Sequence, residues 1–303
     1  MPATQSIYGR MRKYMNRPLS EKASESGTIC LTESGACCFT FENSGLETTA
    51  YFDMADIRDI FAPLLAEWTA RQKALGRRMF VFLAAPPGCG KTTLVSFLAA
   101  LSRDPRFVPD GTLPVQAAPM DGFHHYAAWL KSHTTVRDGR TILFDEIKGA
   151  PETFDVDALA AKLIEARASD TVLWPSYSRT LHDVLPDSGT LTGQIFLVEG
   201  NYLLLDSSPW KELAGQFCDY SLYMYADLSI LRERLIARKT ASGHPQAEAE
   251  AFYAFSDGRN AELVLTDRPK KADLLLEVRD GRYYITGGSD ISLQSAPLSA
   301  ESL

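Results

Sequence analysis

The sequence predicts an α/β fold in which a mainly parallel sheet is covered by helices on both faces. The 303 residues are 45% hydrophobic, which is enough for the core of one large domain or two modest ones. From residue 79 onward, short apolar runs alternate with segments that have helical spacing. Strands buried on both faces are continuous apolar runs of this kind, and helices between them indicate that the strands are parallel.

The N-terminal part precedes this alternation. Residues 1–35 are rich in Ser, Thr, Glu and Gly and are expected to be a disordered tail. Residues 36–78 are expected to form a small hairpin and a helix, because two apolar runs flank an Asn-Ser-Gly turn at 43–45. Asp53 should cap the helix, and Pro63 should bend it or divide it in two.

Residues 79–288 are predicted to form one domain of alternating strands and helices. The expected strands cover 79–85, 113–120, 171–174, 194–200 and 220–226, and the expected helices cover 91–102, 156–168, a segment near Trp210, and 228–241. Residues 272–288 should add a strand and a hairpin that turns at Asp280-Gly281. Residues 289–303 are Ser-rich and are expected to be a second disordered tail.

Charge and composition exclude several classes of protein. A formal net charge of −7 argues against a protein built to coat nucleic acid, and no apolar run approaches the roughly 18 to 20 residues of a membrane span. The five cysteines have no zinc-site spacing and favour a cytoplasmic location. The basic residues within 1–20 fit a simple tail better than an organelle-targeting peptide, which is the alternative.

The segment 85–92, Ala-Pro-Pro-Gly-Cys-Gly-Lys-Thr, matches the phosphate-binding loop G-x-x-x-x-G-K-[ST] except at Ala85, where the motif has Gly. A predicted strand precedes it and a predicted helix follows, so a chance Gly/Pro turn is the weaker interpretation. Backbone N–H groups in such a loop bind polyphosphate. We expect Lys91 to reach the β and γ phosphates of ATP and the Thr92 hydroxyl to join a Mg²⁺ shell. The residues expected to contact ATP are Ala85, Pro86, Pro87, Gly88, Cys89, Gly90, Lys91, Thr92 and Thr93.

Cys89 raises a separate hypothesis because it lies inside this loop, just before a predicted helix. The N-terminus of a helix lowers the pKa of a nearby thiol and makes it more reactive. The sequence therefore suggests that oxidation of Cys89 inhibits the protein.

Asp121 follows the predicted strand 113–120, at the edge where open α/β sheets bind ligands. A carboxylate beside the γ-phosphate can accept the proton of a substrate hydroxyl. The alternative is a turn-forming Asp-Gly pair, since Gly122 comes next. His124 and His125 are adjacent, so their side chains point in different directions, and no third ligand is evident for a zinc site.

Six motifs in series carry a resemblance to a known family. They are APPGCGKTT at 85–93, MDGFHHY at 120–126, KGAPETFD at 148–155, WPSYSRTLHD at 174–183, LVEGNYLLL at 197–205 and RERLIARK at 232–239. Over residues 50–285 the chain resembles the P-loop kinases related to uridine kinase, phosphoribulokinase and bacterial pantothenate kinase. It is most similar to a bacterial branch described as nucleoside/nucleotide kinase-like or as fructose kinase. The resemblance implies a P-loop NTPase three-layer sandwich with a helical lid near 228–260.

The resemblance also implies roles in phosphoryl transfer. Asp121 matches the catalytic general base, and Glu199 matches the acidic residue that holds Mg²⁺; a strand-end salt bridge is the alternative for Glu199. Arg234 and Arg238 lie four residues apart on one predicted helix and match lid arginines that close over the phosphates together with Lys91.

The acceptor pocket is expected to involve a second group of residues. Tyr177 and Arg179 lie in the family segment that lines this pocket, although Arg179 has the alternative of a surface pair with Asp183. In the resemblance His124 faces the substrate, and His182 is expected in the same pocket. His125 is expected to be structural.

Two segments carry weaker predictions. Residues 131–147 are longer than the matching loop of the relatives and are expected to form a hairpin around Asp138-Gly139 over the acceptor site. If so, the acceptor preferences of the relatives do not transfer. Asn260 is expected to cap a helix rather than to contact a ligand.

These features predict an ATP-dependent, Mg²⁺-requiring kinase that phosphorylates a hydroxyl of a sugar, nucleoside or pantothenate-like metabolite. One alternative is a regulatory P-loop protein that binds ATP without phosphoryl transfer, and another is an ATPase coupled to macromolecular work. The motifs of a second pocket favour the kinase, because a nucleotide sensor has no need of an acceptor site. No nucleic-acid or membrane partner is expected, and a homodimer is left open.

Overall fold

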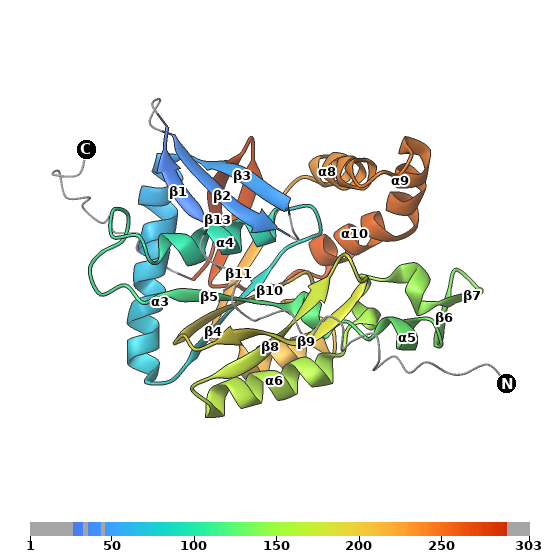
Figure 1. Cartoon of the computed structure of the whole chain (residues 1–303), viewed down its shortest axis with the longest axis horizontal. Helices are drawn as coiled ribbons and strands as arrows, with labels where there is room; N and C mark the ends of the chain where they lie inside the picture. Colours follow the sequence, from blue (N-terminus) through green and yellow to red (C-terminus); the bar gives the residue numbers. More distant parts are fainter. Residues whose placement is uncertain (1–26, 33–35, 44–45, 290–303) are drawn as a thin grey trace, which may run out of the picture.

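The computed structural model, which describes residues 27–32, 36–43 and 46–289, is organised around a six-stranded sheet (Figure 1). Its strand order is β13-β12-β11-β4-β10-β5, and every neighbouring pair is parallel except β12 and β13. The strands are β4 Met79–Ala84, β5 Val115–Pro119, β10 Ile195–Gly200, β11 Tyr220–Tyr225, β12 Leu274–Arg279 and β13 Arg282–Gly287. The α/β fold with a mainly parallel sheet is therefore confirmed.

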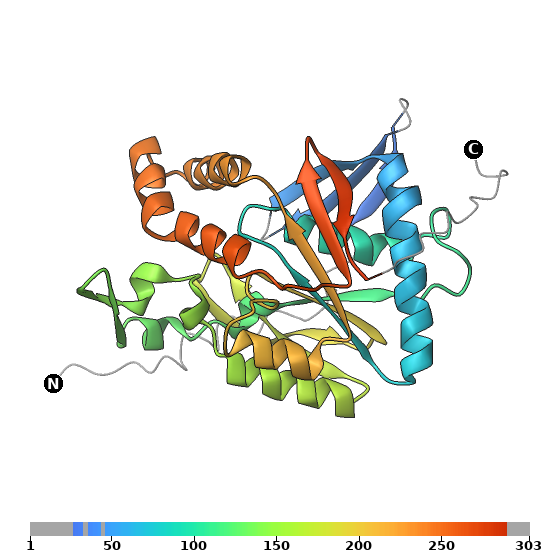
Figure 2. The same cartoon turned by 180° about the vertical axis from the view of Figure 1, so that it is seen from behind.

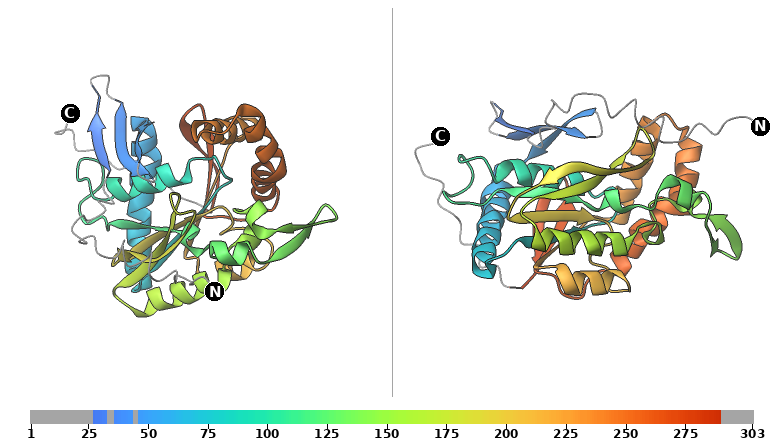
Figure 3. Two further views of the ribbon diagram at one scale, coloured as in Figure 1. Left: turned by 45° about the vertical axis from the view of Figure 1, so that its right-hand side comes forward. Right: turned by 60° about the horizontal axis from the view of Figure 1, so that its bottom comes forward.

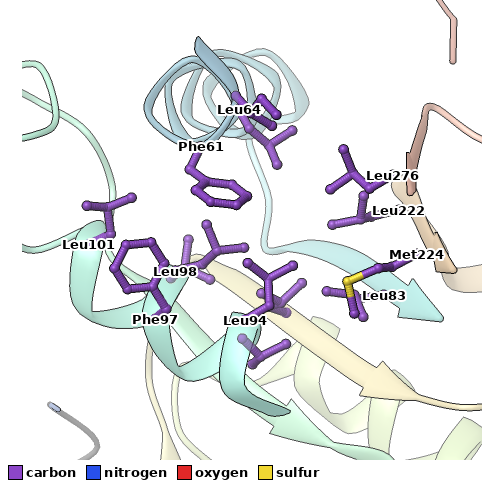
Figure 4. Packing of buried hydrophobic residues seen from close by; sticks show 14 of the residues in the cluster. Phe61, Leu64, Leu83, Leu94, Phe97, Leu98, Leu101, Leu222, Met224 and Leu276 are labelled. Atoms are coloured by element: carbon purple, nitrogen blue, oxygen red, sulfur yellow. The ribbon is translucent and has the colours of Figure 1, made fainter. Parts of the chain in front are cut away.

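Strand β4 lies between β11 and β10, and its side chains alternate between two apolar cores. Met79, Val81 and Leu83 face the core formed with α3 and α4. Phe80, Phe82 and Ala84 face the core formed with α6 and α7. These helices are α3 Ala62–Leu75, α4 Lys91–Leu101, α6 Val156–Ala168 and α7 Trp210–Phe217. Figure 2 shows the α6 and α7 layer, and Figure 4 shows α3 and α4 packed on the other face. The predicted three-layer arrangement follows from this alternation.

The N-terminal residues form a separate three-stranded antiparallel sheet of β1 Thr28–Leu31, β2 Cys37–Asn43 and β3 Leu46–Phe52. The β2–β3 hairpin confirms the prediction. The predicted tail over 1–35 was wrong for β1, a four-residue strand in which only Ile29 is buried, so it carries little apolar signal. The other residues of that tail, apart from Gly27 and Thr32, and residues 290–303 of the second tail lie outside the described residues.

The helical segment after this sheet changes geometry before a proline, as predicted. The Asp53 carboxylate accepts a hydrogen bond from the Ala55 N–H at 2.7 Å, which caps the first turn, α2 Met54–Asp56. A π-helical turn, Ile57–Phe61, then leads into α3, whose second residue is Pro63. Because proline has no N–H, the regular hydrogen-bond ladder cannot run through this point unchanged.

Two hairpins lie outside the central sheet. One pairs β6 Thr134–Arg137 with β7 Arg140–Leu143 and turns at Asp138-Gly139, as predicted. The other pairs β8 Val172–Ser178 with β9 Asp183–Leu191. The prediction that 171–174 belongs to the parallel sheet was wrong, since β8 pairs only with β9 in its own two-stranded sheet, within the described residues. Pro175 in the middle of β8 has no N–H and suits such an edge position.

The helices after β11 rise from the sheet on the same side as the β6–β7 hairpin (Figures 1 and 3). They are α8 Leu228–Ala241, α9 Gln246–Phe252, the π-helical turn Tyr253–Asp257 and α10 Gly258–Thr266; the short α5 Ala127–Leu130 precedes β6. The predicted hairpin at Asp280-Gly281 joins β12 to β13. No helix in the described ranges is long and apolar enough to cross a membrane.

Candidate active site

A cavity of about 670 Å³ opens where β4, β5 and β10 end at their carboxyl edge. This is the edge at which open α/β sheets bind ligands. It is lined by Pro87, Gly88, Lys91, Thr92, Asp121, His124, Lys148, Gly149, Phe154, Tyr177, Arg179, His182, Glu199, Asn201, Arg238, Lys239, Ser242, His244, Asp257 and Asn260. The predicted phosphate loop and the predicted acceptor residues therefore share one cavity.

The phosphate loop joins β4 directly to α4. Gly88 and Gly90 have φ values of 81° and 94°, which side chains with a Cβ rarely adopt. Lys91 is the first residue of α4, and its Nζ donates a hydrogen bond to Asn201 Oδ1 at the end of β10. Its enclosure lowers the pKa of Lys91, because the charged ammonium loses hydration there.

Ala85 explains why the first motif position tolerates a side chain. It is fully buried among the apolar residues of the α3–α4 core, and it is not among the residues with positive φ. A methyl group therefore fits at this point, and the backbone needs no glycine. Pro86 is buried behind the loop, and Thr93 lies on α4 outside the cavity lining.

The environment of Cys89 contradicts the prediction that its thiol is reactive. Its side chain is 2% exposed, and burial raises the pKa of the thiol to about 12. The predicted lowering of the pKa by the helix N-terminus was wrong, because loss of hydration outweighs the helix dipole and the nearby Lys91. A neutral, buried thiol is a poor nucleophile, so Cys89 offers no basis for oxidative inhibition.

Thr92 and Glu199 form a pair suited to Mg²⁺. The Thr92 hydroxyl donates to Glu199 Oε1 at 3.0 Å, and burial raises the pKa of Glu199 to about 7. A buried carboxylate of this kind is stabilised in its charged form by an added cation. Mg²⁺ is usually held by one or two protein groups together with phosphate oxygens and water, and Thr92 and Glu199 would suit that role.

Asp121 is presented by a 3₁₀ turn, Met120–Phe123, at the end of β5. Gly122 in this turn packs against β8 so closely that a Cβ there would lie 2.3 Å from the Pro175 carbonyl oxygen. The Asp121 carbonyl oxygen lies 2.9 Å from Nδ1 of His124. The turn expected for Asp-Gly thus exists, and it also places Asp121 in the cavity lining.

The predicted acceptor residues come together on one wall. The His124 ring lies 3.9 Å from the Phe154 ring and 5.2 Å from the Tyr177 ring, measured between centroids. Arg179 and His182 line the same cavity. Asp183, the alternative partner of Arg179, instead accepts a hydrogen bond from the Ala127 N–H at 2.9 Å.

His125 lies apart from this wall, as predicted. Its ring stacks on Trp129 at 4.0 Å between centroids, and it does not line the cavity. The Trp129 ring stacks in turn on His133 at 4.1 Å. His125 is therefore part of the packing around α5.

The two predicted lid arginines differ in position. Arg238 lines the cavity, where loss of hydration lowers the pKa of its guanidinium. Arg234 lies outside the lining, and its Nη1 is 3.5 Å from the carbonyl oxygen of Gly88. Both come from α8, whose Leu235 packs over Gly88.

Several lining residues were not predicted as site residues. Lys148 and Asn201 lie within quoted motifs, and this position was the signal that could have identified them. Lys239 also lies within a quoted motif, at the end of RERLIARK, whereas Ser242, His244 and Asp257 come from the lid region and left no comparable signal. The prediction for Asn260 was wrong: it is the third residue of α10, buried, and part of the cavity lining.

The β6–β7 hairpin also differs from its prediction. It forms, but none of the described residues 131–147 lines the cavity, so its expected position over the acceptor site was wrong. The hairpin is turned outward, and Asp138 at its tip pairs with Arg259 on α10 at 2.7 Å. Lys148 is the first residue after this segment to reach the cavity.

No family model matches the chain, but several known proteins are similar to it in sequence and structure. "Uncharacterized protein YggC" of Escherichia coli K12 is 43% identical over 80% of this chain and 97% of its own length. "Putative uridine kinase C227.14" of Schizosaccharomyces pombe is 32% identical over 58% of this chain and 72% of its own length. The crystal structure of a "putative fructose transport system kinase" from Silicibacter sp. TM1040 is 28% identical, with a TM-score of 0.61, and is matched over 71% of this chain and 98% of that one.

Proposed function

The chain belongs to the P-loop kinase family of uridine kinase, and from this premise we propose that it transfers the γ-phosphate of ATP to a hydroxyl of a small metabolite. The acceptor class is a sugar, a nucleoside or a pantothenate-like compound. One observation carries the proposal: Asp121 and the phosphate loop, with Lys91 and Thr92, line the same cavity. A protein that only senses ATP has no need of a carboxylate base in its nucleotide site.

The phosphate loop would bind the triphosphate through backbone N–H groups and through Lys91. Asn201 holds the Lys91 ammonium toward the end of β10, so the cation is positioned before ATP arrives. Arg238, from α8, would add a second positive charge. These cations favour the transition state, in which negative charge spreads over the transferred group.

Thr92 and Glu199 are the residues that would hold Mg²⁺. When bound there, the ion would neutralise charge on the β and γ phosphates. Glu199 is fixed at the end of β10 between Lys91 and Thr92, so its carboxylate needs little rearrangement to act as a ligand.

Asp121 would accept the proton of the acceptor hydroxyl. The oxygen of that hydroxyl then forms a bond with the γ-phosphorus, and the bond from the γ-phosphorus to the β,γ-bridging oxygen breaks, leaving ADP. The rings of His124 and Tyr177 would orient the acceptor beside Asp121.

The helices α8 to α10 are the proposed lid. Arg238, Lys239, Ser242 and His244 reach the cavity from this region, whereas Arg234 is positioned at the outer side of Gly88. Closure of the lid over both substrates would exclude water and limit wasteful hydrolysis of ATP. We also propose a cytoplasmic location, since all five cysteines are free thiols.

The test measures phosphorylated product and ADP release with ATP, Mg²⁺ and a panel of sugars, nucleosides and pantothenate. Asp121→Asn should lower transfer by about 10²-fold to 10⁴-fold, since a positioned base contributes that much, while ATP binding stays nearly unchanged. Asp110→Asn, at an exposed residue outside the cavity, is the matched control. Transfer at the wild-type rate by Asp121→Asn would refute the role of the base, and background ADP release with every acceptor would favour a regulatory protein.

A further inference from the structure

The acceptor end of the cavity, defined as His124, Lys148, Phe154, Tyr177, Arg179 and His182, carries two cations, Lys148 and Arg179. The Lys148 Nζ lies 4.7 Å from the centroid of the Tyr177 ring and donates to the His182 carbonyl oxygen at 2.8 Å. No carboxylate among the described residues forms an ion pair with Lys148. Its positive charge is therefore left for a ligand.

The other cations of the cavity have carboxylates near them. Five Lys or Arg side chains and three Asp or Glu side chains line the cavity, although the whole chain has a net charge of −7. Glu199 interacts electrostatically with Lys91 and Arg179, and Asp257 with Arg238 and Lys239. Lys148 stands apart from this compensated set, at the end that an acceptor would occupy.

The segment that presents Lys148 is held firmly. The Gly149 N–H donates to the Thr153 hydroxyl at 3.1 Å, and the Gly149 carbonyl oxygen accepts a hydrogen bond from the Tyr202 hydroxyl. Thr153 is fully buried and its hydroxyl donates to the Ala150 carbonyl oxygen at 2.7 Å. Because Tyr202 follows β10, the position of Lys148 is tied to the strand that carries Glu199.

A cation in a partly enclosed site attracts a ligand of opposite charge and repels cationic ones. In the proposed function the triphosphate binds beside Lys91 and the loop amides, so it does not account for Lys148. The aromatic rings of Phe154 and Tyr177 line the same cavity. An anionic group on the acceptor would satisfy Lys148 directly.

We propose that the acceptor carries a phosphate or carboxylate group, and that Lys148 binds this group while Asp121 faces the hydroxyl to be phosphorylated. The inference rests on the proposed kinase function and narrows it, since neutral sugars and nucleosides lack the anion. Lys148 is a specificity-determining residue in this account and takes no part in proton transfer.

The experiment compares matched acceptors that differ in one anionic group: fructose with fructose 6-phosphate, uridine with uridine 5′-monophosphate, and pantothenol with pantothenate. ADP release and product are measured for the wild-type protein, Lys148→Met, Lys148→Arg and the exposed control Lys131→Met. At least one anionic member should be preferred. Lys148→Met should raise the KM of that acceptor about tenfold to a hundredfold, the range for a hydrogen-bonded charge, with kcat and the KM of ATP within about threefold; Lys148→Arg should restore part of the loss.

A second arm does not depend on turnover. Binding of inorganic phosphate is measured by calorimetry with the phosphate loop saturated by Mg²⁺ and a non-hydrolysable ATP analogue. Binding that is lost in Lys148→Met but kept in Lys131→Met supports the anion site, even if no acceptor on the panel is phosphorylated.

Three results would overturn the inference. The first is a neutral acceptor turned over as well as its anionic partner, which leaves the kinase function intact. The second is an unchanged KM for the anionic acceptor in Lys148→Met. The third is phosphate binding that is absent from the wild-type protein or equal in both Lys148 variants and the control. Loss of thermal stability in Lys148→Met together with a lower kcat would assign Lys148 to holding the His182 turn instead.

Discussion

The phosphate end of the cavity is built from one continuous stretch of chain, whereas the acceptor end is assembled from separate segments. Strand β4, the loop and α4 follow one another over residues 79–101. The acceptor end takes His124 from the turn after β5, Lys148 from the turn after β7, and Tyr177 from β8. The two ends also differ in support, since α4 is packed into the core while β8 and β9 form a two-stranded sheet at its margin.

This difference separates nucleotide binding from acceptor choice. Backbone N–H groups in a fixed loop bind any triphosphate in the same way, so the phosphate end has little freedom to vary. Side chains at the acceptor end come from hairpins and turns that can change independently of one another. Substitutions at the two ends should therefore give different kinetic signatures.

The largest effect is expected at the phosphate end from Lys91→Met. Removal of the cation proposed to bind the β and γ phosphates should lower kcat/KM by roughly 10³-fold with every acceptor, since one preorganised electrostatic group contributes about that much. Lys148→Met should instead affect anionic acceptors alone. Steady-state kinetics with two acceptors, and with Lys131→Met as the control, tests whether the loss in each variant depends on the acceptor. An acceptor-dependent loss in Lys91→Met would contradict the separation of the two ends.

The support of the two ends is compared by removing one aromatic side chain from each. Phe97 on α4 is fully buried, and its ring lies 3.7 Å from that of Phe52 and 5.5 Å from that of Phe39. Phe97→Ala should lower the free energy of unfolding by about 3 to 5 kcal/mol. Tyr177→Ala, at a half-buried residue of β8, should cost clearly less in the same urea denaturation experiment. Equal losses would show that the acceptor end is as firmly packed as the phosphate end.

Glu199, on β10 beside the phosphate end, gives the cavity a pH dependence. Burial raises its pKa from 4.5 to about 7, so ionisation of Glu199 costs more in the folded state than in the unfolded state. The penalty is absent below pH 4.5, grows as the pH rises toward 7 and is constant above it. It should lower stability by about 3 kcal/mol over this window, since one pKa unit corresponds to about 1.4 kcal/mol.

The measurement follows the thermal stability of wild-type protein and Glu199→Gln between pH 4.5 and 8. The difference between the two proteins isolates Glu199 from the other carboxylates. The stability of Glu199→Gln relative to the wild type should increase as the pH rises. Saturating Mg²⁺ and ADP should stabilise the wild type more at pH 8 than at pH 6, because they favour the charged carboxylate. A stability difference that is flat with pH would contradict the raised pKa.

The phosphate end could be predicted from the sequence almost completely, and the physical reason is its continuity. A strand, a Gly-rich loop and a helix in succession define the positions of Lys91 and Thr92 without reference to the rest of the chain. Cys89 was misjudged, because its burial is set by tertiary packing in the α3–α4 core. Ala85, Pro86 and Thr93 were expected to contact ATP, but they do not line the cavity. The local sequence predicts the effect of the helix dipole on the pKa of Cys89, but not the loss of hydration that outweighs it.

The acceptor end could be predicted only through the family resemblance, and not fully. Tyr177 and Arg179 were found because their motif is recognisable, but the pairing of β8 with β9 was not, since an isolated apolar run does not reveal its partner. Asn260 faces the cavity because of how α10 lies against the sheet. Such an orientation is set by tertiary packing and leaves no local signal.

The smallest effect is expected where the β6–β7 hairpin and the proposed lid touch. Asp138, at the tip of the β6–β7 hairpin, and Arg259 of α10 form an ion pair at 2.7 Å, and both side chains are exposed, at 62% and 42%. The Arg259 guanidinium lowers the pKa of Asp138 through this hydrogen bond. Exposed ion pairs contribute little free energy, so Arg259→Ala should change the acceptor KM by at most about fivefold.

A double-mutant cycle with Asp138→Ala separates the pair from its two members. The single variants and the double variant should have the same acceptor KM, because each removes the same contact. At 1 M salt, where the Debye length is about 3 Å, the acceptor KM of the wild type should equal that of the variants. A cycle whose single effects simply add would show that the hairpin and α10 act independently.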